Sequence, residues 1–215
     1  MDSAITPEIY QGYYGEFTIT DDDRRDVLLY RGGLAIAALC FSAGTSLMFW
    51  RSEAVWAQHA VTIFYGLFCS ALGVSLAKIH IYLVPLHRLL QVFWGIGCAV
   101  AIALSLFSGQ PLVRFVVEHP VSIWGIGFTF AALTGIFFKE GFCFRRVETM
   151  LLTPLVPLLL LGHLTQLLSM NLATFGFITW SVLFVIFAAR KFTQPPAADI
   201  GDKSVFDYLK QQKAS

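Results

Sequence analysis

The sequence predicts an all-α polytopic membrane protein, a transmembrane bundle of six helices with both termini in the cytoplasm. Three observations lead to this prediction. The 215-residue chain is 56% hydrophobic and 13% charged, with a mean hydropathy of +0.67, whereas soluble domains are about 45 to 50% apolar and about 25% charged. Six stretches approach the roughly 20 apolar residues that a membrane-spanning helix needs. The charged residues lie mostly at the two ends of the chain and between these stretches.

The six predicted spans follow one another with short connections. They cover approximately residues 28–50, 61–77, 89–107, 122–138, 150–170 and 172–189. The chain is thereby divided into a cytoplasmic tail at 1–27, a transmembrane domain at 28–190 and a second cytoplasmic tail at 191–215. The N-terminal tail is polar and acidic and lacks the apolar segment of a cleavable signal peptide, so the first span is expected to direct insertion.

Lysine and arginine determine the predicted orientation, because cytoplasmic segments carry the excess of these residues. With the N-terminus inside, only Arg51 and Arg114 of the 15 lysines and arginines fall in outer connections. The other 13 lie in the tails and in the cytoplasmic connections. Removing one span would break this alternation, so the charge pattern also supports the number six.

The connections and tails carry local signals. The last two spans are separated only by residues 169–171, which predicts a tight outer hairpin or, alternatively, one bent helical element. The N-terminal tail alternates aromatic and β-branched residues with small or charged ones, which predicts an extended arm before a helix capped by Thr20 or a nearby aspartate. Val205, Tyr208 and Leu209 recur at helical spacing and predict a short amphipathic surface helix. The tryptophans fall mostly near span ends, as in an interfacial belt.

Composition also bears on function. The net charge is +1 and no run of lysine or arginine is present, so the expected partner is the lipid bilayer and not a nucleic acid. The four cysteines lie in separate apolar segments without metal-binding spacing, and no metal site is predicted. A b-type haem needs two histidines at matching depth on facing helices, and His163 has no such partner. No cofactor is therefore predicted, with a haem or a pigment as the alternative.

The densest charges of the membrane domain lie between the fourth and fifth spans. Glu140 and Glu148 can pair there with Lys139, Arg145 or Arg146. A structural loop of ion pairs is the favoured interpretation, and a substrate site at the inner surface is the alternative.

The fifth span carries the polar residues that lie deepest in the predicted membrane. Pro154 and Pro157 remove two backbone donors, so the helix is expected to begin or kink there. His163 lies roughly 20 Å from the inner end at 1.5 Å per residue. His163 and Gln166 are three residues apart and are expected to share a helix face. A neutral histidine bonded to a neighbouring helix is favoured, and a proton path or ligand site is the alternative.

Three further candidates are weaker. His80, His87 and Arg88 lie at the inner end of the second and third spans. Cationic residues at a cytoplasmic membrane edge usually set topology or contact lipid headgroups. The alternative is an anion or metal site formed by the two histidines.

Two stretches of the chain resemble a known family. The first contains YQG at 10–12, GEFTIT at 15–20 and YRGG at 30–33, and the second contains FCFRRVET at 142–149, LTPLVPL at 152–158 and GHL at 162–164. The pattern resembles a family of uncharacterised polytopic integral membrane proteins of cyanobacteria and plastid-bearing organisms. The resemblance implies the thylakoid or plasma membrane of a cyanobacterium and adds weight to the arginine-containing loop and to His163. It implies no catalytic residue.

Three functions are compatible with these features. The favoured one is a non-enzymatic accessory or assembly factor that packs against larger photosynthetic membrane complexes or pigments, using small-residue faces such as Ala38, Ser42 and Ser46. The first alternative is a small transporter or ion-conducting protein that uses the His163 and Gln166 face. The second is a membrane enzyme that acts on a lipid or isoprenoid at the inner surface.

Overall fold

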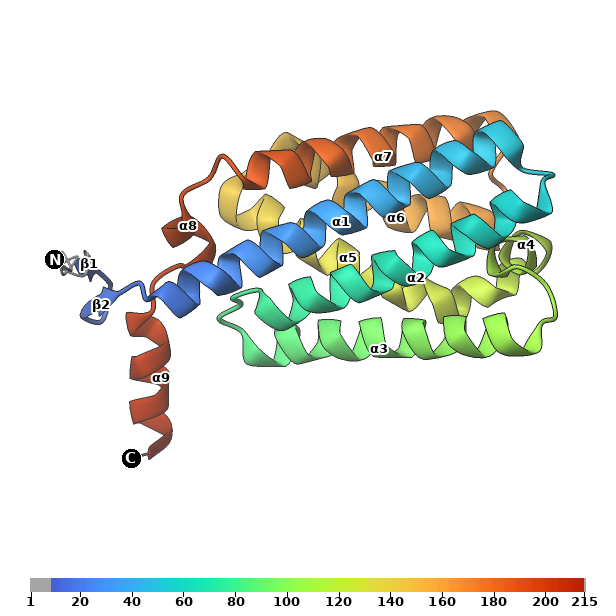
Figure 1. Cartoon of the computed structure of the whole chain (residues 1–215). Helices are drawn as coiled ribbons and strands as arrows, with labels where there is room; N and C mark the ends of the chain where they lie inside the picture. The colour runs from blue at the N-terminus through green and yellow to red at the C-terminus, as the bar shows by residue number, and fades with distance from the viewer. Residues whose placement is uncertain (1–8, 215) are drawn as a thin grey trace, which may run out of the picture.

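Six long helices run side by side in the computed structural model, which describes residues 9–214 (Figure 1). They are α1 (Asp21–Arg51), α2 (Val55–Lys78), α3 (Val84–Phe107), α5 (Ile123–Phe144), α6 (Val147–Leu164) and α7 (Met170–Lys191). Each of the six, α5 together with the short helical turn before it, is long and apolar enough to cross a membrane. The predicted all-α transmembrane bundle of six spans is therefore confirmed.

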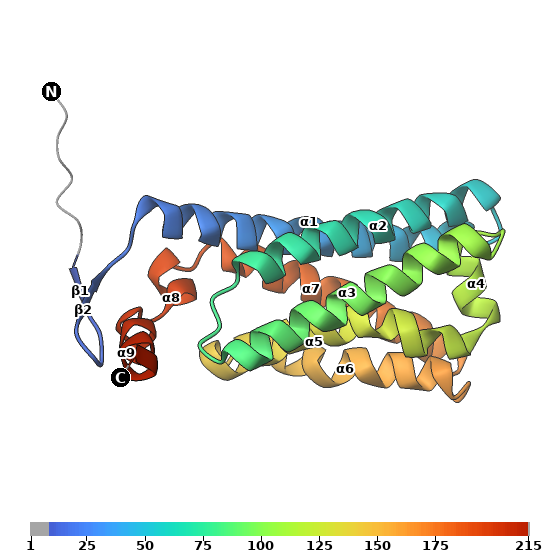
Figure 2. The same ribbon diagram turned by 90° about the horizontal axis from the view of Figure 1, so that it is seen from below.

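Shorter elements lie at the two ends of the bundle (Figures 1 and 2). We call the end that carries both ends of the described chain the tail end, and the opposite end the loop end. The tail end carries β1 (Ile9–Gln11), β2 (Glu16–Thr18), α8 (Pro196–Ile200) and α9 (Ser204–Ala214), and the loop end carries α4 (Leu112–Glu118) and the 3-10 helix η1 (Pro120–Ser122). An even number of spans places both ends of the chain on one side, as observed.

The start of α1 follows the predicted pattern. β1 and β2 form an antiparallel hairpin, so the tail before the helix is extended. The Thr20 hydroxyl accepts a hydrogen bond from the Asp23 backbone N–H at 3.2 Å, and the Asp23 carboxylate accepts one from the Thr20 N–H at 2.8 Å. This reciprocal capping box satisfies two backbone groups at the helix N-terminus.

The connection between α6 and α7 differs from its prediction. The fifth span ends at Leu164 and not near residue 170, and the five residues up to Ser169 turn the chain into a helical hairpin. The alternative of one bent element is therefore wrong. The expectation that the helix begins at the prolines is wrong, because α6 begins at Val147 and contains both Pro154 and Pro157; the alternative of a kink there stays a prediction. Packing against neighbouring helices allows a membrane helix to tolerate such lost backbone bonds.

Aromatic rings fill the middle of the bundle. Trp180 of α7 is fully buried, and its ring centroid lies 4.2 Å from that of Phe41 and 5.3 Å from that of Phe130. Phe137 and Phe184, with centroids 5.3 Å apart, continue the packing towards the tail end. Trp180 therefore belongs to the core and not to an interfacial belt. Paired rings of this kind stabilise a core beyond the area that they bury.

Candidate functional site: a buried charge cluster at the tail end

Charged side chains from four helices meet inside the tail end of the bundle. We call this group the tail-end cluster, and its members are Tyr30 and Arg31 of α1, Glu140 of α5, Lys191 of α7 and Asp199 of α8. All five are buried, and the side chains of Lys191 and Glu140 are 0% exposed. Lysine, glutamate and aspartate are almost never fully buried unless they are paired, so the contacts within the cluster decide whether it is stable.

Lys191 lies at the centre of the cluster. Its ammonium group donates to a Glu140 carboxylate oxygen at 2.9 Å, to the Asp199 carboxylate, and to the Gln194 side-chain oxygen at 3.4 Å. An ammonium group has three N–H donors, so each donor has an acceptor. The Phe144 ring also lies close to this ammonium, with its centroid 4.9 Å from Nζ, a distance at which a cation is attracted to the ring face.

The two carboxylates have partners on other helices. Besides Lys191, Glu140 has two donors, the Tyr30 hydroxyl of α1 and the Lys139 ammonium of its own helix, each 2.9 Å from Oε1. The Asp199 carboxylate accepts from Arg31 Nε at 2.7 Å. Every charged member of the cluster is thereby bonded to a group of opposite charge. Desolvation of a buried ion costs several kcal/mol, and only such complete pairing offsets the cost.

Helix lengths explain why these residues meet. α1 has 31 residues and is about 46 Å long, whereas the hydrocarbon core of a bilayer is about 30 Å thick. Its first turns therefore extend beyond the apolar region, and Arg31 lies roughly 15 Å from the start of the helix. Lys191 and Glu140 occupy the last turns of α7 and α5 at the same level. After α7 ends at Lys191, Pro195 and Pro196 prevent the helix from continuing. The chain turns there, and α8 places Asp199 in the cluster.

A second set of charges lies beside the cluster, at the turn between α5 and α6. The buried Glu148 carboxylate accepts from Arg190 Nη1 at 2.9 Å, and its other oxygen lies 3.8 Å from Arg146 Nη1. Arg146 donates instead to the Gln194 side chain at 2.9 Å. Arg145 closes the turn with a positive φ of 49° and is exposed. Among the side chains that the structure describes, no ion-pair partner of Arg145 lies within 4 Å.

The predicted loop of ion pairs is thus only partly correct. Glu140 does pair with Lys139, but its buried partner is Lys191 of another helix, and Glu148 pairs mainly with Arg190. The predicted role of Arg145 as a partner is wrong, because its side chain is exposed and forms no ion pair with a described residue. Four of the five cluster members, Tyr30, Arg31, Lys191 and Asp199, were not predicted as site residues. Arg31 alone among them has a signal in the sequence, since it is an arginine inside an apolar stretch.

His163 bridges α6 to α4 at the loop end. Its Nε2 atom lies 3.1 Å from the Val116 backbone oxygen, and because a carbonyl oxygen only accepts, Nε2 must carry the proton. The side chain is half-buried. Gln166 lies beyond the end of α6, is exposed and has a positive φ of 56°. The expectation that His163 and Gln166 share a helix face is therefore wrong, since the helix ends between them.

The Val116 contact leads to a prediction for His163. We expect His163→Gln to keep most of the protein's stability, because an amide N–H can also donate to the carbonyl. His163→Leu removes the donor and is expected to lower the free energy of unfolding by roughly 1 kcal/mol, the usual size of interhelical polar contacts in membranes. Thermal unfolding of the purified variants in detergent measures both values. Equal midpoints for the two variants would contradict a role for this hydrogen bond.

The weaker candidates lie around the connection between α2 and α3. His87 Nε2 lies 2.6 Å from the Leu76 backbone oxygen and 3.2 Å from the Gln91 amide, so the ring satisfies the C-terminus of α2. His80 lies in the connection itself, where burial lowers the pKa of its imidazole. Arg88 is exposed. Within residues 9–214, no three His, Cys, Asp or Glu side chains are placed to hold a metal ion.

These features define the protein as a polytopic α-helical integral membrane protein with a neutralised charge cluster at one end. Residues 74–208 match the family model described as an uncharacterized integral membrane protein (DUF2301). The match covers more than half of the chain, so the protein belongs to this family. The matched region contains Glu140, Lys191 and Asp199, whereas Arg31 precedes it. Neither a curated protein nor a solved structure matches the chain significantly.

Proposed function

We propose that the protein is a non-enzymatic accessory subunit that holds a transmembrane helix of a larger membrane complex against α1. The proposal depends mainly on one observation, a groove between the loop-end half of α1 and the middle of α7. The groove has a volume of about 360 Å³. Small and β-branched residues line most of it, with one phenylalanine, and they include Ser42, Thr45, Ser46, Ile178, Ser181 and Val182. Small residues let two membrane helices approach closely.

The hydroxyl groups in this groove favour a helix over a lipid tail as its occupant. Ser42 Oγ and Ser181 Oγ are both buried and have no hydrogen-bond partner among the described residues. An acyl chain offers no acceptor, so both groups would stay unsatisfied against lipid, at a free-energy cost. A neighbouring helix can offer a backbone carbonyl or a polar side chain to either hydroxyl after rotation of the serine χ1 angle, because both Oγ atoms are inaccessible in their present rotamers. A partner helix with a serine, threonine or asparagine at the contact therefore fits the groove best.

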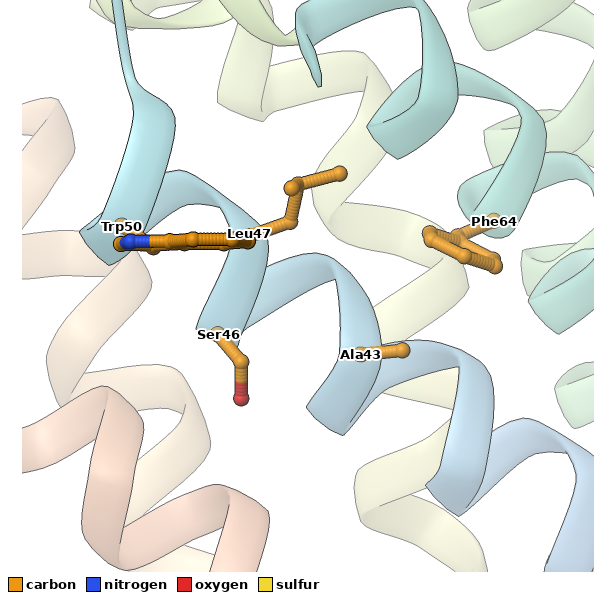
Figure 3. A pocket seen from close by; sticks show the side chains of 5 residues that line it. All are labelled: Ala43, Ser46, Leu47, Trp50 and Phe64. Carbon is orange, nitrogen blue, oxygen red and sulfur yellow. The ribbon is translucent and has the colours of Figure 1, made fainter.

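A second groove on the other side of α1 widens the surface that a partner can use. It lies between α1 and α2, has a volume of about 520 Å³ and is lined by the five residues drawn in Figure 3. Ser46 and Leu47 point to different sides of α1 in this view, with Trp50 one turn further along (Figure 3). Ser46 lines both grooves. The half of α1 nearer the loop end thus has a groove on each side, into which rows of side chains of a further helix can pack.

The rest of the bundle supports a packing role over the alternatives. The middle of the bundle is filled by the aromatic rings around Trp180, which favours a scaffold over a conduit. His163 is engaged with a backbone carbonyl, and Glu140 and Glu148 are held by cations of the chain itself. A proton path or a catalytic acid would instead need these groups to face a substrate.

The resemblance seen in the sequence extends the proposal to the partner and its location. It supports a photosynthetic membrane complex of the thylakoid or plasma membrane as the partner. The excess of lysine and arginine at the tail end supports a cytoplasmic position for this end.

Ser46→Leu tests the docking surface. Ser46 is exposed, so a larger side chain there fills the grooves without disturbing the bundle, and we expect most of the protein to leave its complex. Blue-native electrophoresis of gently solubilised membranes measures the fraction that migrates with larger assemblies. Ala103→Leu is the matched control, since Ala103 is exposed on α3, which does not line either groove. Migration of the unmodified protein only as a free monomer would sink the proposal.

A further inference from the structure

The Asp199 carboxylate lies between a cation of α1 and a cation of α7, and we call the space that it fills between them the pocket. Arg31 of α1 and Lys191 of α7 both bond to this carboxylate, which comes from the five-residue helix α8 outside the bundle. Arg31 directs both Nε and Nη2 to the same carboxylate oxygen. A guanidinium that presents two donors side by side is suited to the oxygens of a carboxylate or a phosphate group.

The charge balance of the pocket requires an anion. Without Asp199, the two cations of the cluster, Arg31 and Lys191, would face the single carboxylate of Glu140. One positive charge would then be uncompensated in a largely buried space, in addition to that of the neighbouring, partly exposed Lys139. Such charges are unstable unless water enters or another anion replaces the carboxylate.

The connections of α8 allow it to move as a unit. Pro195 and Pro196 precede or begin it and donate no backbone hydrogen bond, and Gly201 follows it with a positive φ of 73°. Its apolar anchor is Ile200, which packs with Val27 and Ile19 outside the main core. α8 is therefore attached by this small apolar cluster, which includes its Ala197, by the charged pocket and by the hydrogen bond from Arg31 to the Pro195 carbonyl, whereas each long helix packs along its length.

We infer that the Arg31 and Lys191 pocket is a binding site for a phosphate group, and that Asp199 occupies it as an internal substitute until such a group displaces α8. The ligand replaces the charge of Asp199, so the cluster stays neutralised in both states. Displacement releases α8 and exposes Ile200, which couples ligand binding at the bundle to the position of the C-terminal segment. An anionic lipid headgroup and free inorganic phosphate share the required chemistry, and the test distinguishes them.

The experiment follows α8 in the full chain. Ile200 is 1% exposed, so the thiol introduced by Ile200→Cys reacts slowly with a maleimide while α8 is seated. The substitution is made together with Cys143→Ser, because Cys143 is exposed. The protein is placed in nanodiscs of phosphatidylcholine, of phosphatidylcholine with phosphatidic acid, or of phosphatidylcholine with added inorganic phosphate. We expect labelling to become at least about tenfold faster with phosphatidic acid or inorganic phosphate than in phosphatidylcholine alone, whose phosphate carries its own choline cation; a tenfold shift in population produces this change.

The outcomes separate the alternatives. Acceleration by phosphatidic acid alone identifies a lipid headgroup, and equal acceleration by inorganic phosphate identifies a free anion. Equal rates in all three preparations would show a fixed structural ion pair and overturn the inference. A second measurement uses Asp199→Asn, which empties the pocket of its carboxylate. This variant should retain about tenfold more phosphatidic acid than the unmodified protein in native mass spectrometry, and retention at the unmodified level would also overturn the inference.

Discussion

Lys191→Met is expected to destabilise the protein more than any other single charge substitution in the bundle. The change leaves Glu140 and Asp199 buried without their shared cation, and breaking a buried pair in this way typically costs about 3 to 5 kcal/mol. The protein should accumulate poorly in membranes, and its unfolding midpoint in detergent should fall sharply. Arg25→Met is the control, because Arg25 is exposed at the same end and a surface charge contributes about 0 to 1 kcal/mol.

A double substitution separates charge imbalance from loss of packing. Lys191→Met with Glu140→Gln removes one charge of each sign and leaves Asp199 paired with Arg31. We expect the double variant to recover part of the lost stability. If Lys191→Met alone has the same midpoint as Arg25→Met, then water enters the cluster and its charges are not desolvated.

Gly33→Ala is also expected to destabilise the protein, because the backbones of α1 and α2 lie close together there. A Cβ atom at Gly33 would lie 2.6 Å from the Ala71 backbone oxygen and closer still to the Ser75 hydroxyl. The backbone of α2 cannot rotate away as a side chain can, so the helices must separate. Overpacking of this kind typically costs about 1 to 3 kcal/mol. Unfolding of the purified variant by SDS measures the loss.

The adjacent glycine provides the control for this prediction. A Cβ atom at Gly32 meets nothing within 4 Å. Gly32→Ala should therefore be neutral or slightly stabilising, since alanine favours a helix over glycine by about 1 kcal/mol. Similar losses for both substitutions would mean that glycine flexibility, and not the close approach to α2, is what the fold requires at this position.

The fold could be predicted from the sequence because each span carries its own signal. Length and hydropathy alone identify six helices, and the Thr20 cap and the extended arm before it are local patterns as well. The predicted boundaries were less accurate at helix ends. Helices α2 and α5 continue past their apolar residues to Lys78 and Phe144, because polar residues near a membrane surface can remain helical. The end of α6 at Leu164 depends on the turn at Gln166, which hydropathy does not detect.

The tail-end cluster could not be predicted in the same way, because it depends on long-range contacts. Glu140 and Lys191 are 51 residues apart, and Arg31 and Asp199 are 168 apart. Only the packing of α1, α5 and α7 at one level brings them together. The count of lysines and arginines correctly placed Arg31 and Lys191 at the same end of the bundle. It treated Lys191, however, only as a residue that sets the topology. The predicted pairing of Glu140 with Lys139 was correct. The predicted pairing of Arg145 was wrong, because its side chain is exposed at the turn between α5 and α6.

Photocrosslinking from the half of α1 nearer the loop end in intact native membranes tests the proposed docking most directly. A photoreactive phenylalanine analogue replaces Ser46 in one variant and Ala103 in the other, and both positions are exposed on long helices. The proposed function predicts a discrete adduct with a second polypeptide from position 46 and none from position 103. Adducts with lipid alone from position 46, or the same polypeptide adducts from both positions, would contradict a partner helix in these grooves.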